Sequence, residues 1–423
     1  MGDGYTADEQ TKFVTDATNF SHYLFATVPY VNYKNYFNIF AIKVISEESG
    51  TRHPNTASDC SSASPLVPVS NPKTFFGCTF DYDGIHRLMY PTNFQNIYSV
   101  LVTNFPNYDQ VIIIANSPYY GGGGGEYAAT TTHPYAAEVV THEMGHSFGG
   151  LEDEYESGID FEAPNQSKVS DPATVRWKNW IGSNDIDIYK KGATDWYRPH
   201  QNCKMRYLNR PFCSVCTEAI IERIHILTDP VRAFSPVDTL LVSTDSVIHF
   251  AIDLIKPEPN TLSTLWRLDG EIVAGQVDSF HVALDTLPLG DHTFNVLVTD
   301  TSSMLRVYNH SSLNRHFSLI NWRIKKASSG VHLSGEQDYF MFEVSPNPMT
   351  SVLNIKGSTE KARAVSISLM SVDGNQVSPT LRFELHAGDF ERDIDVSRLL
   401  PGIYVLNLQI DNQPITVKLI KIK

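Results

Sequence analysis

The sequence predicts an amino-terminal domain of α/β (α+β) class followed by two all-β sandwich domains. An unalternated apolar run, Val111–Ile114, precedes an amphipathic helical pattern from Pro134 to Gly149, and this order is typical of a mixed α/β domain. Further along the chain, short alternating strands bounded by turn residues replace that pattern. A chain of 423 residues also exceeds what one hydrophobic core normally organises. We therefore expect domains at residues 1–232, 233–332 and 338–423.

The amino-terminal domain carries further predicted elements. Apolar residues recur at helical spacing in Tyr5–Asn19, which predicts a helix, and the β-branched and aromatic run Asn38–Ile45 predicts a strand. Ser46–Pro72 is rich in Ser, Pro, Asn and Thr, as is typical of a long loop. Cys213–Leu227 predicts a helix that closes the domain, and Pro230–Pro236 marks the expected boundary.

Alternating strands characterise the rest of the chain. Val247–Ile252, Leu265–Leu268 and Thr293–Val298 are examples from the second domain. They predict a β-sandwich of immunoglobulin type with Trp266 in its core. The mostly polar segment 327–336 predicts a linker, and the last domain again consists of short strands and turns.

Composition and charge exclude several classes of partner. The formal net charge is −14, from 33 basic and 47 acidic residues, which argues against nucleic acid and anionic membranes. No apolar run approaches the length of a transmembrane segment. The polar start, Met1-Gly2-Asp3-Gly4, has no signal-peptide core, so it fits either a cytosolic protein or a chain whose leader was removed. The oligomeric state is not indicated.

Five cysteines are too few for a disulfide scaffold. Cys60 and Cys78 could close one loop, and Cys203, Cys213 and Cys216 form a second cluster, which leaves one thiol unpaired. The Cys213-x-x-Cys216 spacing resembles a zinc half-site, but a complete site would need a ligand in addition to Cys203. A structural disulfide or reduced core thiols are therefore favoured over structural zinc.

Five consecutive glycines, Gly121–Gly125, lie between the apolar strand and the helix. No GK[ST] follows and no helix opens directly on them, so they do not match a phosphate-binding loop. They are consistent with a flexible turn. They are equally consistent with backbone beside a cleft, left bare so that an extended peptide can add as a strand.

The predicted helix contains the pattern HExxH. His142 and His146 stand one turn apart on one face and can hold one zinc ion, while Glu143 lies close enough to accept a proton from a zinc-bound water. Gly149 and Gly150 provide a helix stop that lets the chain turn back toward the metal. The opposite face of the helix is apolar, which predicts that the motif faces a cavity: Ala137, Val140, Met144 and Phe148.

The third zinc ligand is less well defined by the sequence. Glu152, Asp153 and Glu154 all lie within reach of a chain that turns at Gly149. Asp153 has the shorter and stiffer side chain, so we expect it to bind zinc while its neighbours support the ligands. A glutamate from a later helix, such as Glu162, is the alternative.

The run from His142 to Leu151, followed by Asp153-Glu154-Tyr155, resembles the IgA-peptidase family of metallopeptidases, which belongs among the metzincin-like zinc peptidases. The resemblance implies zinc on His142 and His146, the general base on Glu143 and the third ligand on Asp153. In two respects the chain departs from the pattern, because Glu152 replaces the usual metzincin ligand and the family's N-terminal extension is not present. The likeness covers most of residues 5–227 and extends to Gly4-Tyr5-Thr6, Asn38-Ile39-Phe40, Gly50-Thr51, Arg198-Pro199, Cys203-Lys204-Met205-Arg206 and Phe212–Cys216.

Two further residues gain a role only from this resemblance. Met205 resembles the methionine that turns beneath the metal in metzincins, although an ordinary core methionine would look the same. Tyr207 stands where some of those enzymes place a catalytic tyrosine near the oxyanion, although a structural tyrosine fits as well.

The carboxyl-terminal segment resembles a second family, the type IX secretion sorting domain of Bacteroidetes. The resemblance rests on Val344–Pro348, Val372–Gly374, Ile394–Ser397 and Leu400–Tyr404. It implies an exported protein, secreted or on the cell surface, and favours a removed leader at the polar start.

Together these patterns predict a zinc-dependent endopeptidase that hydrolyses peptide bonds of extracellular protein or glycoprotein. Immunoglobulin is a candidate substrate only through the family label. The alternative is a catalytically silent zinc fold that binds surfaces through its β-sandwich domains. The remaining histidines, His53 and His86 among them, have no ligand spacing and are expected to be surface or core residues.

Overall fold

The computed structural model describes residues 1–63, 65–158, 160–243, 247–288, 290–306, 316–326, 341–347, 349–359, 361–411 and 413–422; the expected linker at 327–336 lies outside them. The chain divides into two units. The first contains Met1–Thr228, together with Lys256–Thr261 and a segment that begins at Ser302. The second begins at Asp229 and contains the remaining strands.

A four-stranded sheet organises the first unit, in the order β1-β2-β4-β3. Three strands are parallel: β1 (Gly2–Asp3), β2 (Ile112–Ala115) and β4 (Ala128–Thr130). β3 (Gly122–Gly123) runs antiparallel to β4 at the edge. The expected apolar strand is confirmed as β2, which pairs on both sides and is largely buried.

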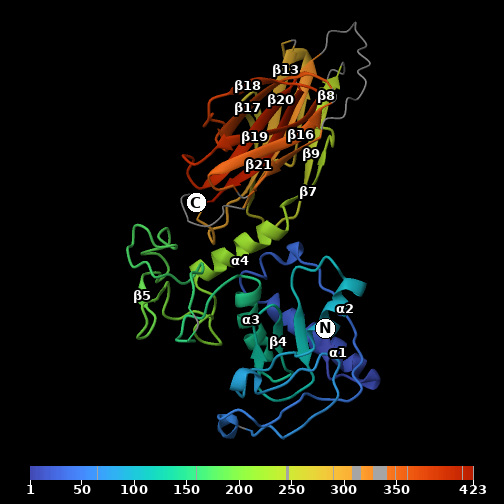
Figure 1. The fold of residues 1–423 in the computed structure, drawn as a ribbon, viewed down its shortest axis with the longest axis vertical. Coiled ribbons are helices and arrows are strands. Elements are labelled where there is room, and N and C mark those ends of the chain that lie inside the picture. Colours follow the sequence, from blue (N-terminus) through green and yellow to red (C-terminus); the bar gives the residue numbers. More distant parts are fainter. Residues whose placement is uncertain are drawn as a thin grey trace. The chain divides into compact units, whose positions relative to one another are not determined.

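Four α-helices accompany this sheet: α1 (Gln10–Leu24), α2 (Phe94–Asn104), α3 (Ala136–Ser147) and α4 (Ser214–Leu227). The predicted motif helix is α3, which packs against β3 and β4; Figure 1 shows α3 beside β4. The predicted closing helix is α4. Short elements complete the unit: 3-10 turns at Ala7–Glu9, Lys34–Tyr36, Cys60–Ser62 and Tyr82–Gly84, and the hairpin of β5 (Tyr189–Lys190) and β6 (Tyr197–Arg198).

The first helix lies later in the chain than expected. It was expected at Tyr5–Asn19, but Thr6 and Glu9 form a capping box, in which the Glu9 carboxylate accepts the backbone N–H of Thr6 at 2.9 Å. This arrangement holds Ala7–Glu9 in a 3-10 turn. The helix then continues to Leu24 because its apolar side chains remain buried on one face.

The expected strand at Asn38–Ile45 is wrong. These residues are described, and they form neither a helix nor a strand. Ile39 and Phe40 are more than half exposed, whereas Val44 is buried. The β-branched composition therefore reflects an extended segment that rests a few side chains on the core without joining the sheet.

All five cysteines are free and buried, so the suggested Cys60–Cys78 loop closure is wrong. In the second cluster, Cys216 Sγ lies 3.6 Å from Cys203 Sγ and 3.5 Å from Cys213 Sγ. A disulfide requires about 2.05 Å. Of the two arrangements favoured for this cluster, the structure contains reduced core thiols.

Two facing sheets form the first β-sandwich. The larger sheet has the order β11-β10-β13-β14-β8, and the smaller has the order β12-β9-β7. β8 pairs parallel with β14, while the other neighbours are antiparallel. The strands are β7 (Val231–Ser235), β8 (Leu240–Ser243), β9 (Val247–Leu254), β10 (Leu262–Leu268), β11 (Glu271–Gly275), β12 (Ser279–Ala283), β13 (Gly290–Asp300) and β14 (Phe317–Lys326), with a 3-10 turn at Leu284–Thr286.

Two sequence expectations concern this sandwich. Trp266 is fully buried in its core, as expected, and stacks on Trp322 with ring centroids 6.0 Å apart. The expected boundary at Pro230–Pro236 overlaps β7, which pairs with β9. The longest segment of the first unit ends at Thr228, and the second unit begins at Asp229.

The last part of the chain also contains two sheets, in the orders β15-β16-β19 and β18-β17-β20-β21. Their inward side chains share one core that contains Leu353, Leu369 and Leu406. The strands are β15 (Met341–Ser345), β16 (Val352–Thr359), β17 (Arg363–Ser371), β18 (Leu381–Leu385), β19 (Gly388–Asp395), β20 (Gly402–Ile410) and β21 (Gln413–Lys421).

Candidate metal centre

The two histidines of α3 are oriented by backbone carbonyl groups. His142 Nδ1 lies 3.0 Å from the carbonyl oxygen of Lys204, and His146 Nδ1 lies 2.8 Å from that of Leu151. Because a carbonyl oxygen can only accept, each Nδ1 carries the proton. Each Nε2 therefore presents a free lone pair, which is the form of histidine that binds metals.

Asp153 completes this cluster. Its Oδ1 lies 3.2 Å from His142 Nε2 and 3.3 Å from His146 Nε2. The three atoms lie within 4.8 Å of one another. Asp153 Oδ1 is buried without a hydrogen-bond partner, so three lone pairs converge on one point. Such an arrangement is stable only with a cation at its centre, and the N₂O donor set fits zinc.

The pKa values respond to the same convergence of charge. Burial acts to lower the pKa of His146, but the carboxylate of Asp153 beside Nε2 outweighs burial and raises it to about 9. The pKa of His142 is raised for the same reasons. Burial acts to raise the pKa of Asp153, and the two histidines reverse this effect and depress it. The cluster therefore attracts a positive charge, whether a proton or a metal ion.

A tight turn after α3 brings Asp153 back to the histidines. Gly149 allows this turn because a Cβ on it would lie 2.8 Å from the Gly145 carbonyl oxygen. Gly150 follows with a φ of 62°, in the left-handed region that glycine adopts at helix ends. The predicted helix stop thus serves to place the acid that follows.

The neighbouring acids are held elsewhere. Glu154 is fully buried, and its Oε1 accepts hydrogen bonds from Asn165 at 3.2 Å and from the Cys216 thiol at 3.4 Å. Burial raises the pKa of Glu154 well above its ordinary value. Glu162, the alternative ligand, instead accepts from Arg176 at 2.8 Å. Asp153 is the acid that the fold brings to the two histidines.

Glu143 lies beside the glycine run. A Cβ on Gly124 would lie only 2.4 Å from Glu143 Oε2, so this backbone touches the carboxylate. Burial raises the pKa of Glu143, while the two neighbouring histidines and Arg87 oppose that rise. Of the two interpretations of the glycine run, the proximity of Gly124 favours backbone beside a cleft.

The outer edge of β3 is nevertheless partly occupied. Gly122 accepts a hydrogen bond from the Met89 N–H and donates one to the Arg87 carbonyl, both at 3.1 Å. An extended peptide therefore cannot pair with Gly122 itself. The glycines from Gly123 onward, next to Glu143, are the remaining place for it.

Met205 packs under the motif helix. It is fully buried, and a Cβ on Gly145 would lie 2.4 Å from its Sδ. The preceding residue, Lys204, holds His142 through its carbonyl and forms a buried ion pair with Glu138 of α3, at 2.6 Å. Met205 is thus part of the support beneath the two histidines, as its resemblance implied.

Two tyrosines differ in their relation to the cluster. Tyr207, the expected catalytic tyrosine, is half exposed, and the Arg206 guanidinium lies over its ring at 4.7 Å. Burial raises the pKa of Tyr155, and the nearby carboxylate of Asp153 adds to this rise, so the Tyr155 hydroxyl lies close to the cluster. No role was expected for Tyr155, although it stands in the motif two residues after Asp153.

Comparison with protein families identifies both ends of the chain. Residues 1–187 match the family IgA Peptidase M64, and residues 343–423 match the Secretion system C-terminal sorting domain. The amino-terminal part of the chain is therefore similar to the M64 peptidases. Both resemblances drawn from the sequence are confirmed, and the sorting domain indicates a secreted or cell-surface protein. In the described residues, no helix is long and apolar enough to cross a membrane.

Other comparisons are less informative. No curated protein matches the chain. One similar solved structure is β-glucuronidase 3 of Bacteroides uniformis, with 6% identity, a TM-score of 0.18, and coverage of 55% of this chain and 30% of that one. Another is the YadV chaperone, with 12% identity, a TM-score of 0.17, and coverage of 44% of this chain and 98% of that one. The fibronectin(III)-like modules of Clostridium thermocellum CbhA are a third, with 10% identity, a TM-score of 0.15, and coverage of 44% of this chain and 92% of that one. The match thus spans only 30% of the β-glucuronidase, and TM-scores this low support no inference about fold or function.

Proposed function

We propose that this protein is a secreted, zinc-dependent endopeptidase that cleaves extracellular protein or glycoprotein. One observation carries the proposal: His142 Nε2, His146 Nε2 and Asp153 Oδ1 converge on one point. The helix that provides the two histidines also bears Glu143. The match of residues 1–187 to a peptidase family supports the same chemistry.

The proposed mechanism assigns each group one task. A zinc ion held by His142, His146 and Asp153 would polarise the scissile carbonyl and acidify the attacking water. Glu143 accepts the proton of that water and returns it to the leaving amine. The bare backbone at Gly124 leaves the carboxylate accessible to water and peptide.

Two tyrosine side chains are candidates for further roles at the site. Tyr207 is the proposed donor to the developing oxyanion, on the strength of its place two residues after Met205. Tyr155 is proposed as a positioning residue, because its hydroxyl lies close enough to the carboxylate of Asp153 for that carboxylate to raise the pKa of Tyr155. Tyr207→Phe should lower kcat with the bound metal unchanged, whereas Tyr155→Phe should weaken metal affinity about 10-fold or more.

The substrate class follows from the export signal and the peptidase family. A sorting domain indicates activity at or beyond the cell surface, where proteins and glycoproteins are available. Immunoglobulin stays a candidate through the family name alone, because specificity depends on loops and accessory domains.

Cleavage of a broad peptide library by the zinc-loaded protein tests the proposal. We expect chelator-sensitive cleavage, and Glu143→Ala should lower kcat/KM by at least about 10²-fold while zinc is retained. Bound zinc with no cleavage of any peptide would overturn the proposal and favour a silent fold that binds surfaces through its β-sandwich domains.

The third ligand has its own test. Asp153→Ala should weaken zinc binding more than Glu152→Ala or Glu154→Ala, measured by competition with a chromophoric chelator. Glu152→Ala is the closest control, since it removes an adjacent acid of the same charge. Equal zinc affinity in the Asp153 and Glu152 variants would refute the assignment.

A further inference from the structure

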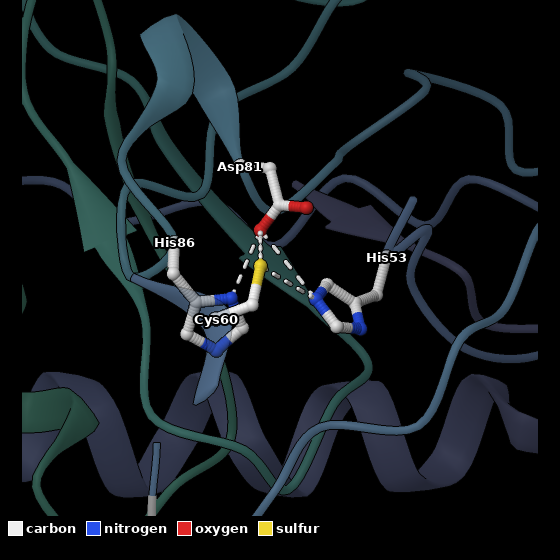
Figure 2. Close-up of side chains that lie close together, drawn as sticks. All are labelled: His53, Cys60, Asp81 and His86. Atoms are coloured by element: carbon white, nitrogen blue, oxygen red, sulfur yellow. Dashed lines mark hydrogen bonds and ion pairs between the residues drawn. The ribbon is translucent and has the colours of Figure 1, made fainter. Parts of the chain in front are cut away.

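A second cluster of metal-binding side chains lies in the same domain, outside the site above. It contains His53, Cys60, Asp81 and His86, all of which are buried (Figure 2). Figure 2 shows the Asp81 carboxylate and the Cys60 sulfur between the two imidazole rings. One ligand atom from each residue lies within 4.8 Å of all the others.

Neighbouring groups direct the ligand atoms of this cluster inward. His53 Nδ1 lies 3.1 Å from the carbonyl oxygen of Pro68, so it carries the proton and leaves a lone pair on Nε2. Asp81 Oδ2 accepts the N–H of Thr56 at 2.6 Å, which turns Oδ1 toward the cluster. His53 Nε2 then faces Asp81 Oδ1 at 3.4 Å. Two lone pairs face each other there, and a cation between them would remove the repulsion.

The separations agree with one four-coordinate metal ion. Bonds of about 2.3 Å to sulfur and about 2.0–2.1 Å to nitrogen or oxygen place tetrahedral zinc ligands about 3.3–3.6 Å apart. Cys60 Sγ lies 3.8 Å from His53 Nε2 and 3.3 Å from Asp81 Oδ1. His86 Nδ1 lies 2.9 Å from Asp81 Oδ1. Shifts of a few tenths of an ångström would complete a tetrahedron.

We propose that His53, Cys60, Asp81 and His86 bind a structural zinc ion, distinct from the metal of the peptidase site. Two imidazoles, one thiolate and one carboxylate form a mixed N, S and O set that suits zinc better than calcium or magnesium, which prefer oxygen ligands alone. Four protein ligands leave no open position, which is typical of a structural and not a catalytic site.

A different function for these residues, a cysteine nucleophile activated by His53, is disfavoured. Cys60 is only 8% exposed, so a substrate cannot reach its sulfur. Burial and the adjacent Asp81 both raise the pKa of the thiol, which is opposite to what a nucleophilic cysteine needs. A metal ion, in contrast, stabilises the thiolate directly.

The position of the cluster gives the metal a role. Its four ligands come from an irregular part of the chain, residues 53–86, which has little regular structure to hold it. Directly after His86, Leu88 and Met89 pair with Gly122 of β3, two residues before Gly124, which touches Glu143. A zinc ion would therefore tie the long loop to the wall of the peptidase site.

Cobalt substitution of the full-length protein tests this inference. A thiolate bound to Co²⁺ gives an intense near-ultraviolet charge-transfer band, and the peptidase site contains no sulfur ligand. We expect the band in the parent protein and its loss in Cys60→Ala, together with one metal ion fewer per chain. Cys78→Ala is the matched control, because Cys78 is a buried cysteine of the same domain outside the cluster.

Further variants keep the test decisive. Cys213→Ala should retain the band, which separates this cluster from the Cys203, Cys213 and Cys216 group near Glu154. His86→Ala provides a second substitution in case Cys60→Ala does not fold, and it should shift or abolish the band. Absence of the band in folded, Co²⁺-loaded parent protein would overturn the inference, as would a band that survives Cys60→Ala and disappears in Cys213→Ala. In either case the four side chains form a hydrogen-bonded core cluster only.

Discussion

Gly124→Ala is expected to separate catalysis from stability. The new Cβ would lie 2.4 Å from Glu143 Oε2, whereas ordinary van der Waals contact begins at 3.4 Å, so one of the two groups must move by about 1 Å. Gly124 directly follows β3, and Glu143 lies on α3. The carboxylate is the end of a flexible side chain, so it is the group that moves.

The size of the effect follows from that displacement. A misplacement of about 1 Å in a catalytic group can cost about 10²-fold in rate, equivalent to about 2.7 kcal/mol of transition-state stabilisation. The free energy of unfolding should change by no more than about 0.5 kcal/mol, because no backbone atom has to shift. We therefore expect kcat to fall about 100-fold while bound zinc and chemical denaturation stay at parental values.

The assay compares steady-state peptide cleavage, zinc content and denaturant unfolding for the parent and two variants. Gly402→Ala is the control, since its Cβ would have no neighbour closer than 4.0 Å. It should leave all three measurements unchanged. A Gly124→Ala protein with full zinc content and a kcat within about threefold of the parent would refute the placement of this backbone against the general base.

Three further predictions concern stability. Lys204→Met leaves Glu138 buried without its cation, so the unfolding free energy should fall by about 3–5 kcal/mol, and Lys204→Met with Glu138→Leu should recover most of it in denaturant titrations. Trp266→Ala should cost about 3–5 kcal/mol and lower the calorimetric transition of the first β-sandwich, because the indole is fully buried. Burial acts to lower the pKa of His292, but its 2.6 Å hydrogen bond to Asp269 outweighs burial and raises the pKa. The stability that this hydrogen bond contributes is therefore complete below pH ~6.5 and is lost as pH rises through the folded-state pKa of His292. The parental Tm should therefore fall more between pH 6 and 8 than that of His292→Asn, and parallel curves would contradict the assignment.

The parts of the fold and site that could be predicted from the sequence are those determined by local spacing. His142 and His146 are separated by one helical turn, so their common face requires no knowledge of the tertiary structure. The apolar back of α3 and the buried strand β2 follow from periodicity in the same way. Met205 could be found only because a family resemblance placed it, since its contact with Gly145 spans sixty residues of chain.

The spacing of residues in the sequence does not predict a site where irregular segments bring the side chains together. His53 and His86 were expected to be ordinary surface or core residues, because no helix or strand relates their positions. They meet Cys60 and Asp81 only through the folding of residues 53–86, in which neighbouring loops exchange backbone hydrogen bonds such as His53 with Ser70. The error at Asn38–Ile45 has a related cause: β-branched residues favour extended backbone, but pairing depends on a neighbour that sequence does not reveal.

The sequence alone does not distinguish which of the consecutive acids Glu152, Asp153 and Glu154 is the third ligand. Reach from Gly149 is similar for all three, so chain length cannot select one. The direction of the side chains can select one, because successive side chains of extended backbone point to opposite sides. The residues that flank Asp153 are anchored through their backbone: the Glu152 N–H donates to Asn165 Oδ1 and the Glu154 N–H donates to the Met205 carbonyl, both at 2.8 Å. These two bonds set the register that turns Asp153 toward the histidines, and a slip of one residue would present a glutamate in its place.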